Sequence, residues 1–413
     1  MDDVIVVGAG PAGNNTALGL ATKGYSVRVI DIRYNIGEKL CTGIVGQECT
    51  RRFPIDPSLV YREASSAEVI APGTGRVRFE AAKPQASIVD RAAYVASFAH
   101  QAQAAGANYH LGCRVLKVAA QDDGVTVVTD GGGYRAKAMV LAAGFGSPLT
   151  RQLGLGMVLD YVTGAEAVVS TNGTAEVLVY LGRQVAPGFF SWLVPTSPGR
   201  ALAGLLVRRQ AQAQLQQFIE WQMREGQIAD VICEAACWGV PLRPLRRTYR
   251  DRVLVVGDAA GPTKPTTGGG IYYSLLASEI ASQTLCEALA GGDLSAGALS
   301  RYQRRWKSVL STEMEIGYSA RRLFEALNDQ QISSLVHQAG ANGTRSDLVN
   351  SPDVSFDWHS RTIDKVMGHP VLGRALRLIN PLLARLARSP EPAFTLSPAA
   401  SSRPEPLAVD PST

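Results

Sequence analysis

The N-terminal segment joins two short apolar runs through a glycine turn and a helical stretch. Residues 4–7 are apolar, the turn over 8–13 reads Gly-Ala-Gly-Pro-Ala-Gly, and residues 14–23 have helical character. A second apolar run over 26–30 ends at Asp31. This order predicts a strand, a helix and a parallel strand, which is the βαβ unit of a dinucleotide-binding fold.

Each glycine of the turn has its own physical task in such a unit. Gly8 permits the tight turn, Gly10 lets the backbone approach a pyrophosphate, and Gly13 allows the helix to pack closely on the strand. The first N–H groups of the helix then face the phosphates. Asp31 would accept hydrogen bonds from both ribose hydroxyls, and the absence of an arginine in its place favours NAD or FAD over NADP. The alternative is an ordinary glycine turn of an α/β protein.

A second glycine-rich segment decides between the two cofactors. An apolar run over 252–256 is followed by Gly-Asp-Ala-Ala-Gly at 257–261, then by a loop of Pro, Thr and Gly and a helical stretch over 271–290. Asp258, at the end of a strand, is placed to accept a hydrogen bond from a ribityl hydroxyl. Glycines before a helix let its N–H groups meet the flavin edge, where negative charge develops on reduction. The segment therefore predicts FAD.

Four further stretches carry a resemblance to a known family. They read GEKLCTGIVG (37–46), VDRAAY (89–94), FFSWLVP (189–195) and GDAAGPTKPTTGGGIYYSLL (257–276). Together with the glycine turn they resemble FAD proteins of the p-hydroxybenzoate-hydroxylase fold and, among these, the geranylgeranyl reductase family. The similarity spans roughly residues 3–375. It implies an FAD-dependent oxidoreductase that reduces carbon–carbon double bonds of isoprenoid chains.

The resemblance also implies where FAD lies along the chain. The glycine turn and Asp31 meet the adenosine diphosphate, and the backbone at Arg114 and Val115 meets the adenine. Arg91 is expected near the phosphates or the ring, with a structural ion pair as the alternative. The predicted FAD-binding set is Gly8, Gly10, Ala12, Gly13, Asp31, Ile32, Cys41, Thr42, Arg91, Arg114, Val115, Gly257, Asp258, Pro265, Gly268, Gly269, Gly270 and Ile271.

Three residues are predicted to take part in catalysis. Cys41 lies in a segment that passes over the flavin in the family, and a free thiol is mostly protonated at neutral pH, so it is a candidate proton donor or substrate-positioning group. The alternative is a small apolar residue that shapes the pocket. Trp192 is expected to face the ring and, with Phe189 and Phe190, to line an apolar channel, although ordinary sheet core is the alternative. Tyr272 and Tyr273 follow the loop of Pro, Thr and Gly, and at least one of them is expected to point toward the site, with Tyr272 as the predicted catalytic residue.

The implied reaction is a reduction of an isoprenoid double bond. Reduced FAD delivers a hydride to one carbon, and an acid or water supplies a proton to the other. An unactivated alkene needs carbocation character in the transition state, which an aromatic face such as Trp192 stabilises. The cofactor carries the chemistry, while the protein places the substrate and excludes water.

One departure from related flavoproteins bears on the electron donor. Many of them have Asp-Gly after the third strand, whereas this chain reads Ala-Ala-Gly-Phe-Gly-Ser at 142–147. Loss of that aspartate weakens a hydroxylase interpretation and puts direct reduction by NADPH in doubt. The donor is therefore left open between NAD(P)H and a ferredoxin or another carrier protein.

Three rival functions remain on the sequence. The first is a flavin monooxygenase acting on an aromatic compound or polyketide. The second is a halogenase, because FSWLVP at 190–195 resembles a W-x-W-x-I-P pattern but lacks its first Trp. The third is an electron-transfer flavoprotein, which the lack of an iron–sulfur cysteine cluster disfavours.

The predicted fold class is α/β (α+β), with a Rossmann-like FAD-binding domain interleaved with a β-sheet substrate domain and followed by C-terminal helices. Alternation over 165–169 and 176–180 suggests a sheet with one solvated face. The FAD-binding domain is expected over 1–60, 85–160 and 246–295, the substrate domain over 61–84 and 161–245, a helical region over 296–388, and a disordered Pro/Ser-rich tail over 389–413.

Composition limits the partners and the location. The formal net charge of +5 is modest and the basic residues are scattered, which argues against nucleic-acid binding. Cys233 and Cys237 lie four apart in an apparent helix, but no second pair completes a metal site. No apolar run reaches the roughly 18 residues of a membrane span, and the start is no signal peptide, so a cytoplasmic protein is expected. Residues 371–388 carry four Arg and no acid, which suggests either peripheral membrane contact near a lipid substrate or a helix that closes the fold.

Overall fold

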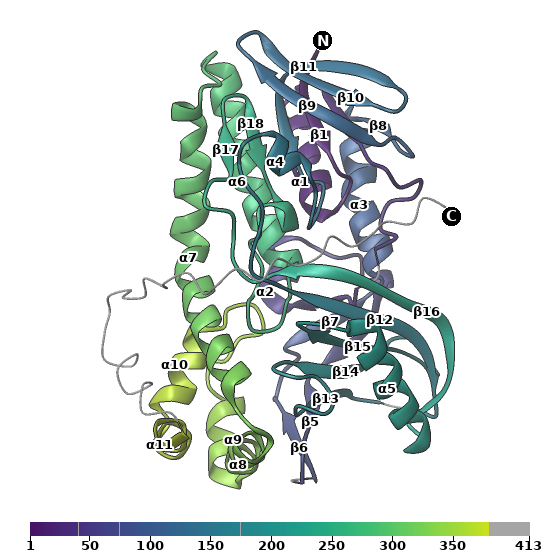
Figure 1. Ribbon diagram of the computed structural model, residues 1–413, viewed down its shortest axis with the longest axis vertical. Coiled ribbons are helices and arrows are strands. Elements are labelled where there is room, and N and C mark those ends of the chain that lie inside the picture. The colour runs from purple at the N-terminus through teal and green to yellow at the C-terminus, as the bar shows by residue number, and fades with distance from the viewer. Residues whose placement is uncertain (40, 74, 174, 380–413) are drawn as a thin grey trace.

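The computed structural model describes residues 1–379 except 40, 74 and 174. Half of the molecule is built on an eight-stranded sheet, at the top of Figure 1. In spatial order its main path is β17 (Tyr249–Arg250), β18 (Val253–Val255), β11 (Gly132–Leu141), β1 (Asp2–Val7), β2 (Val27–Ile30) and β8 (Asn108–His110). β10 (Gly124–Thr129) pairs with β11, and β9 (Val115–Gln121) pairs with β10. The strands from β18 to β8 run parallel, as expected of a Rossmann-like sheet.

The predicted βαβ unit at the N-terminus is confirmed. Strands β1 and β2 pair in parallel, with α1 (Pro11–Ala21) between them. The helix begins three residues earlier than the expected position 14, because Pro11 is favoured in the first turn of a helix. α6 (Ile271–Ala290) occupies the range expected for the second glycine-linked helix.

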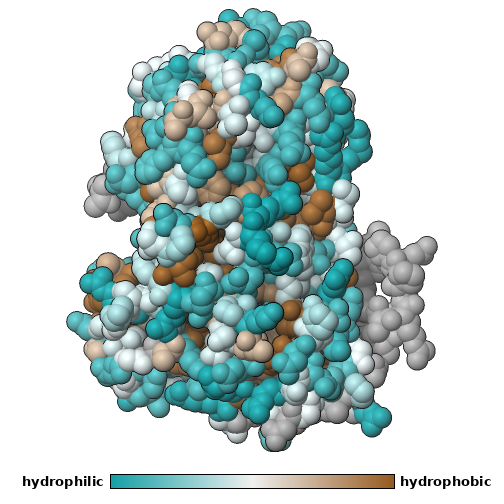
Figure 2. Space-filling view, turned by 180° about the vertical axis from the view of Figure 1, so that it is seen from behind, coloured by the Kyte–Doolittle hydropathy of each residue, from teal (hydrophilic) through white to brown (hydrophobic). Residues whose placement is uncertain are grey.

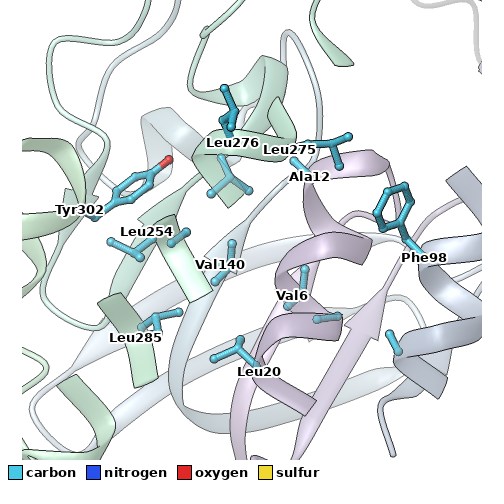
Figure 3. Close-up of a cluster of buried hydrophobic side chains, with 14 of the residues drawn as sticks. Val6, Ala12, Leu20, Phe98, Val140, Leu254, Leu275, Leu276, Leu285 and Tyr302 are labelled. Atoms are coloured by element: carbon cyan, nitrogen blue, oxygen red, sulfur yellow. The ribbon is translucent and has the colours of Figure 1, made fainter. Parts of the chain in front are cut away.

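Helices cover one face of this sheet. α1, α3 (Arg91–Ala104) and α6 pack on it, and α7 (Ala296–Ala326) packs against α6. Figure 3 shows the resulting core, where Leu20 of α1, Val140 of β11 and Leu285 of α6 converge. The other face is covered by β9, β10 and α4 (Leu149–Gln152). Because both faces are buried, the edge of the sheet where the strands end is left to bind a ligand.

The second half of the molecule is a mostly antiparallel sheet of seven strands. Its order is β16 (Ile228–Pro241), β12 (Tyr161–Thr171), β15 (Arg200–Val207), β14 (Phe190–Pro195), β13 (Val177–Leu181), β5 (Ser66–Ala71) and β6 (Gly75–Glu80). α5 (Ala211–Arg224) packs on one face. A small sheet of β3 (Ile44–Gly46), β7 (Ala86–Val89) and β4 (Val60–Ala64) contributes Ile44 and Ile88 to the hydrophobic cluster on the other face. We call the face opposite α5 the inner face.

Two expectations about the second sheet are wrong. Residues 165–169 do not alternate between core and solvent, because both faces of β12 are covered, and even Glu166 is fully buried. Cys233 and Cys237 lie on β16, not on a helix, because this segment pairs with β12 along the edge of the sheet. Tertiary pairing here overrides the local helical tendency of an Ala- and Glu-containing stretch.

The C-terminal region is helical, as predicted. After α7 come α8 (Asp329–Gly340), α9 (Asn342–Val349), α10 (Ser360–Gly368) and α11 (Pro370–Ile379). α8 packs against β5 and β6, while α7 runs along both halves of the molecule (Figure 1). The predicted tail over 389–413 and the last part of the helical region, 380–388, lie outside the described residues.

The fold class is therefore confirmed as mixed α/β with C-terminal helices. The domain bounds stay a prediction, supported by the way the strands divide between the two large sheets. Within the described part of the chain, no helix is long and apolar enough to cross a membrane. Figure 2 shows the back of the molecule, where small groups of hydrophobic residues interrupt a mostly hydrophilic surface.

Candidate functional site

The N-terminal glycine turn has the geometry that the sequence predicts. Gly8 has a φ of +111°, and a Cβ there would overlap the carbonyl of Ala142 on the neighbouring strand. A Cβ on Gly13 would overlap the carbonyl oxygen of Gly8. In contrast, no described atom lies within 4 Å of a Cβ built on Gly10. Two glycines are thus required by the fold, and the third borders open space beside the N-terminus of α1, where a pyrophosphate would bind.

Asp31 follows β2 and supports the turn. Its carboxylate accepts hydrogen bonds from the N–H of Ala9 at 2.6 Å and from the N–H of Arg33 at 2.7 Å. The next residue, Ile32, is 47% exposed, which is unusual for an isoleucine and leaves an apolar surface beside the predicted ribose site. The backbone N–H of Cys113 donates to the carbonyl of Asp31, which brings the start of β9 next to this position. Arg114 is exposed there, and Val115 is the first residue of β9.

The two predicted FAD segments are neighbours in space. A Cβ on Gly257 would lie 3.0 Å from that of Ala12, so the turn after β18 rests on the start of α1. The amide of Asn15 on α1 donates to the hydroxyl of Ser278 on α6 at 2.9 Å. Segments about 250 residues apart thus form one surface at the ends of β1 and β18, where a parallel sheet binds its ligand.

Residues 261–270, which we call the glycine loop, lead from this turn into α6. Gly268 has a φ of +72° and lies against Leu206 and Val240 of the second sheet. Pro265 packs on Gly317 of α7. No described side chain caps α6, whose N-cap is Gly270. Its first N–H groups, at Gly270 and Ile271, are therefore available to a ligand, while the N–H of Gly269 donates to the hydroxyl of Thr267 at 3.4 Å.

A buried ion pair anchors the glycine loop to the C-terminal region. The Nζ of Lys264 lies 3.4 Å from the carboxylate of Asp357, and the two side chains are 6% and 2% exposed. Lys264 also donates to the carbonyl of Phe356 at 2.6 Å. The same aspartate accepts from the backbone N–H of Glu48 at 2.9 Å, at the start of α2 (Gln47–Arg52). Burial lowers the pKa of Lys264, and the charge of Asp357 opposes that shift. The neighbouring His359 occupies the N-cap position of α10, and its ring contacts Thr266.

Residues 37–39 and 41–43, which we call the cysteine loop, reach from the end of β18 to the second sheet through Lys39. A Cβ on Gly37 would lie 2.6 Å from the backbone of Ala92, and one on Gly43 would lie 2.5 Å from the carbonyl of Val89. Arg91 donates to the carbonyls of Gly37 and Lys39, at 3.1 and 2.6 Å. Both ends of the loop are thus held in place, while Cys41 and Thr42 within it are half-buried. Arg91 thus holds the cysteine loop through these two hydrogen bonds, while its Nε has no partner among the described residues.

Lys39 of the cysteine loop contacts Asp258 at the end of β18 and Trp238 of the second sheet. The Nζ of Lys39 lies 2.9 Å from Asp258 and 5.9 Å from the ring centre of Trp238 on β16. Asp258 uses Oδ2 in this pair. The remaining oxygen, Oδ1, lies near Gly270 and retains lone pairs for a ribityl hydroxyl.

Trp192 lies on the inner face of the second sheet, and the expectation that it faces the flavin ring stays a prediction. Its ring rests on Gly204 of the adjacent strand, where a Cβ would lie 2.5 Å from ring atoms. Phe190 packs beside it with ring centres 5.7 Å apart. Phe189 is instead fully buried under Arg321 of α7, whose guanidinium carbon lies 3.0 Å from the ring centre.

Glu166 is a site residue that sequence reasoning missed. It is fully buried on β12, and its Oε2 accepts a hydrogen bond from the Nε1 of Trp192 at 3.1 Å. Among the described residues its Oε1 has no partner of hydrogen-bonding geometry. Burial raises the pKa of Glu166 to about 8, against opposing contributions from Trp192, Arg91 and Thr42. The alternating pattern over 165–169 was misleading, because it predicted that this side chain faces solvent.

We expect Glu166→Gln to change the pH dependence of stability. Between pH 4.5, the ordinary value, and about 8, the folded protein keeps a proton that the unfolded chain has lost. Stability therefore falls through this window by about 1.4 kcal/mol per pH unit from this group. The glutamine variant lacks that slope, so its stability relative to the native protein should rise with pH. Urea unfolding at a series of pH values measures the difference, and parallel curves would contradict it.

Tyr272 has a different environment from that predicted for a catalytic residue. It is buried against Phe53 and Trp358, with ring centres 6.4 and 5.5 Å apart, and burial raises its pKa to about 12. Its neighbour Tyr273 is buried beside Lys264. Both rings contact the core and the C-terminal region, so a catalytic role of Tyr272 stays a prediction.

A small cavity opens beside Asp258. It is lined by Phe145, Ser147 and Tyr161, among others. Phe145 lies in the segment that lacks the usual Asp-Gly, and its ring stacks on Gly239 of β16 and packs 4.9 Å from Tyr161. The segment 142–147 thus carries no carboxylate, and the ring of Phe145 borders the cavity.

These features fit FAD. Open space at Gly10, the exposed apolar side chain of Ile32 and the uncapped start of α6 suit its phosphates, adenine and ring in turn. Residues 44–276 match the family described as DAO, FAD dependent oxidoreductase.

Curated relatives cover most of the chain. Digeranylgeranylglycerophospholipid reductase 1 of Methanococcoides burtonii is 29% identical over 355 residues, which is 81% of this chain and 86% of the relative. Digeranylgeranylglycerophospholipid reductase of Methanocaldococcus jannaschii is 28% identical over 362 residues, covering 84% of this chain and 92% of the relative.

Solved structures share the fold. A geranylgeranyl bacteriochlorophyll reductase-like protein of Thermoplasma acidophilum matches with a TM-score of 0.80 at 21% identity, over 92% of this chain and 99% of its own. A p-nitrophenol 4-monooxygenase of Pseudomonas putida matches with a TM-score of 0.67 at 17% identity, over 84% of this chain and 96% of its own. A single fold therefore carries several flavin chemistries, and only the site separates them.

Proposed function

Because this chain belongs to the FAD dependent oxidoreductase family, we propose that it reduces carbon–carbon double bonds of isoprenoid lipid chains. FAD is its cofactor, and it is an oxidoreductase. The observation that carries the proposal is the aromatic inner face around Trp192. This face lies between the cysteine loop and the glycine loop, and both loops are anchored to neighbouring segments. The names of the curated relatives support an isoprenoid phospholipid as the substrate class.

Residues of the N-terminal glycine turn, of the ends of β2 and β18 and of the start of α6 would hold the cofactor. Gly10 and the start of α1 bind the phosphates, Asp31 the ribose, and Asp258 the ribityl chain, while the start of α6 binds the flavin edge. When bound and reduced, FAD supplies the electron pair and one hydrogen that saturate a double bond. The face of Trp192 stabilises positive charge that develops on the alkene, and its burial keeps water away. Cys41 and Thr42 are the residues of the cysteine loop that border this region.

Rival chemistries find less support in the site. A hydroxylase of this fold is expected to carry Asp-Gly after the third strand, whereas residues 142–147 of this chain contain no aspartate and Phe145 of that segment packs on Gly239. An apolar inner face with two tryptophans, Trp192 and Trp238, is suited to a hydrocarbon chain. The sequence relatives, which cover over four-fifths of the chain, carry reductase names.

The electron donor and the membrane contact belong to the same proposal. Because the segment 142–147 lacks the aspartate of the usual Asp-Gly, we favour a small carrier protein such as a ferredoxin over NAD(P)H. A lipid substrate implies a cytoplasmic enzyme that touches a membrane peripherally. α11 is not a ready contact, because Leu372 and Leu376 are already buried in the protein. The rest of the basic segment, 380–388, lies outside the described residues.

Product analysis tests the proposal. The FAD-loaded protein is incubated without oxygen with dithionite and a digeranylgeranyl glycerophospholipid in detergent micelles. We expect lipids heavier by the mass of two hydrogen atoms for each double bond reduced. Boiled protein and a lipid with saturated chains serve as controls. Unchanged lipid after many equivalents of reductant would contradict the proposal.

Gly204→Ala is expected to impair the reaction without loss of FAD. The new methyl group would displace the ring of Trp192, which lies 2.5 Å from the Cβ position. A misplacement of about 1 Å near the reacting atoms lowers turnover by about a hundredfold. Gly133→Ala on β11 is the matched control, since no described atom lies within 4 Å of its Cβ position. Equal turnover and equal FAD content in both variants would show that the position of Trp192 is unimportant.

A further inference from the structure

We propose that Glu166 is the acid that supplies the proton of the reduction, a role that rests on the proposed function. The inference starts from where the side chain lies. In the sheet, Glu166 of β12 is directly opposite Gly204 of β15, and Gly204 is directly opposite Trp192 of β14. Directly opposite residues of antiparallel strands point to the same face.

Gly204 leaves the space in which the side chains of Trp192 and Glu166 meet. Because glycine has no side chain, the ring of Trp192 and the carboxyl group of Glu166 meet above it, with Nε1 and Oε2 3.1 Å apart. The tryptophan proposed to face the substrate is therefore hydrogen-bonded to a buried acid. An ordinary core position would hold an apolar side chain here, since a buried carboxyl group is costly unless it is partnered.

The unpaired atoms at this place point to a proton-transfer role. Oε1 of Glu166 and Nε of Arg91 are both buried and have no partner among the described residues. The hydroxyl of Thr42 in the cysteine loop also acts on the carboxyl group, where it opposes the rise of the pKa of Glu166. The groups that face Glu166 are thus Trp192 from β14, Thr42 from the cysteine loop and Arg91 from α3.

This environment suits an acid that is neutral at rest and charged for a short time. Burial, as described above, favours the protonated form at neutral pH. After the proton leaves, the nearby charge of Arg91 and the hydrogen bond from Trp192 stabilise the carboxylate. A general acid works best when its pKa is close to the working pH.

When bound and reduced, FAD would supply the electron pair and one hydrogen to the first alkene carbon. The O–H bond of Glu166 breaks, and its proton reaches the second carbon through the hydroxyl of Thr42, which gives up its own proton as it accepts another. Once the product has left, the carboxylate that remains on Glu166 regains a proton from solvent through the same hydroxyl.

The first test reads the proton directly and needs no activity. The infrared carbonyl band of an un-ionised carboxylic acid is recorded on the FAD-loaded, oxidised protein at about pH 6 and about pH 10. We expect a band that is lost at the higher pH in the native protein and that Glu166→Gln lacks at both. Glu68→Gln is the matched control, because Glu68 lies in the same sheet but pairs with Arg76 at 3.1 Å. A spectrum unchanged by Glu166→Gln would overturn the proposal.

The second test follows turnover. Glu166→Gln should lower kcat for lipid reduction by about a hundredfold or more, with KM and FAD content unchanged. Glu166→Asp should restore part of the rate, and the alkaline limb of the native pH profile should disappear in the glutamine variant. Native kcat in Glu166→Gln would overturn the proposal. If the native protein reduces no isoprenoid lipid while the infrared band is present, the proposed function fails and the buried proton on Glu166 stands.

Discussion

Asp357→Ala should lower the free energy of unfolding by about 3–5 kcal/mol. The substitution removes the only charge that the described residues place beside the buried ammonium group of Lys264 at ion-pair distance. It also removes the acceptor for the N–H groups at the start of α2. A buried charge without its partner is far more costly than the pair was favourable. Urea unfolding of the FAD-loaded protein measures the change.

Two further variants separate the ion pair from general damage. Asp353→Ala, in the same segment but half-buried, should cost less than about 1 kcal/mol. The double variant Lys264→Met with Asp357→Leu removes both charges and should recover a large part of the stability. Because Lys264 belongs to the glycine loop, Asp357→Ala should also weaken FAD binding. A loss below about 1 kcal/mol in Asp357→Ala would contradict this account of the loop.

Gly10→Ala should remove FAD and leave the fold intact. The residue has extended backbone dihedrals, φ −78° and ψ −178°, that any residue adopts, and its Cβ position is open in the protein. The methyl group would then hold the pyrophosphate away from the start of α1. We expect FAD affinity to fall at least about thirtyfold, or ~2 kcal/mol, while the stability of the FAD-free protein changes by less than about 0.5 kcal/mol.

Gly13→Ala provides the contrast. Its Cβ would overlap the carbonyl of Gly8, so the whole turn must move and stability should fall together with FAD binding. Flavin fluorescence titration and thermal unfolding of the apoprotein distinguish the two variants. If Gly10→Ala binds FAD as tightly as the native chain, the pyrophosphate does not lie where we place it.

Local features of the sequence predicted much of the fold and the cofactor. The glycine turn at 8–13 and the loop before α6 were predicted because a turn and a helix start depend on a few adjacent residues. The C-terminal helices followed from their helical spacing in the same way. Strand β16 was missed because its pairing with β12 is not encoded within the strand itself.

The remaining parts of the site depend on contacts between distant segments. Lys264 and Asp357 are 93 residues apart, and no pattern in the residues around either one indicates that it forms an ion pair. Glu166 appeared to be solvent-facing, and it is buried because its side chain lies on the inner face beside Trp192, where the hydrophobic cluster of that face covers it. The placement of Trp192 over Gly204 likewise required the register between β14 and β15.

The most direct test of the central claim is a single anaerobic turnover. The FAD-loaded protein is reduced with one equivalent of dithionite and mixed with a digeranylgeranyl glycerophospholipid, or with the same lipid bearing saturated chains. We predict that the absorbance of oxidised flavin returns with the unsaturated lipid alone and that one double bond per flavin is lost. Flavin that stays reduced with the unsaturated lipid, but reoxidises with release of peroxide once air is admitted, would contradict the reductase and favour an oxygenase.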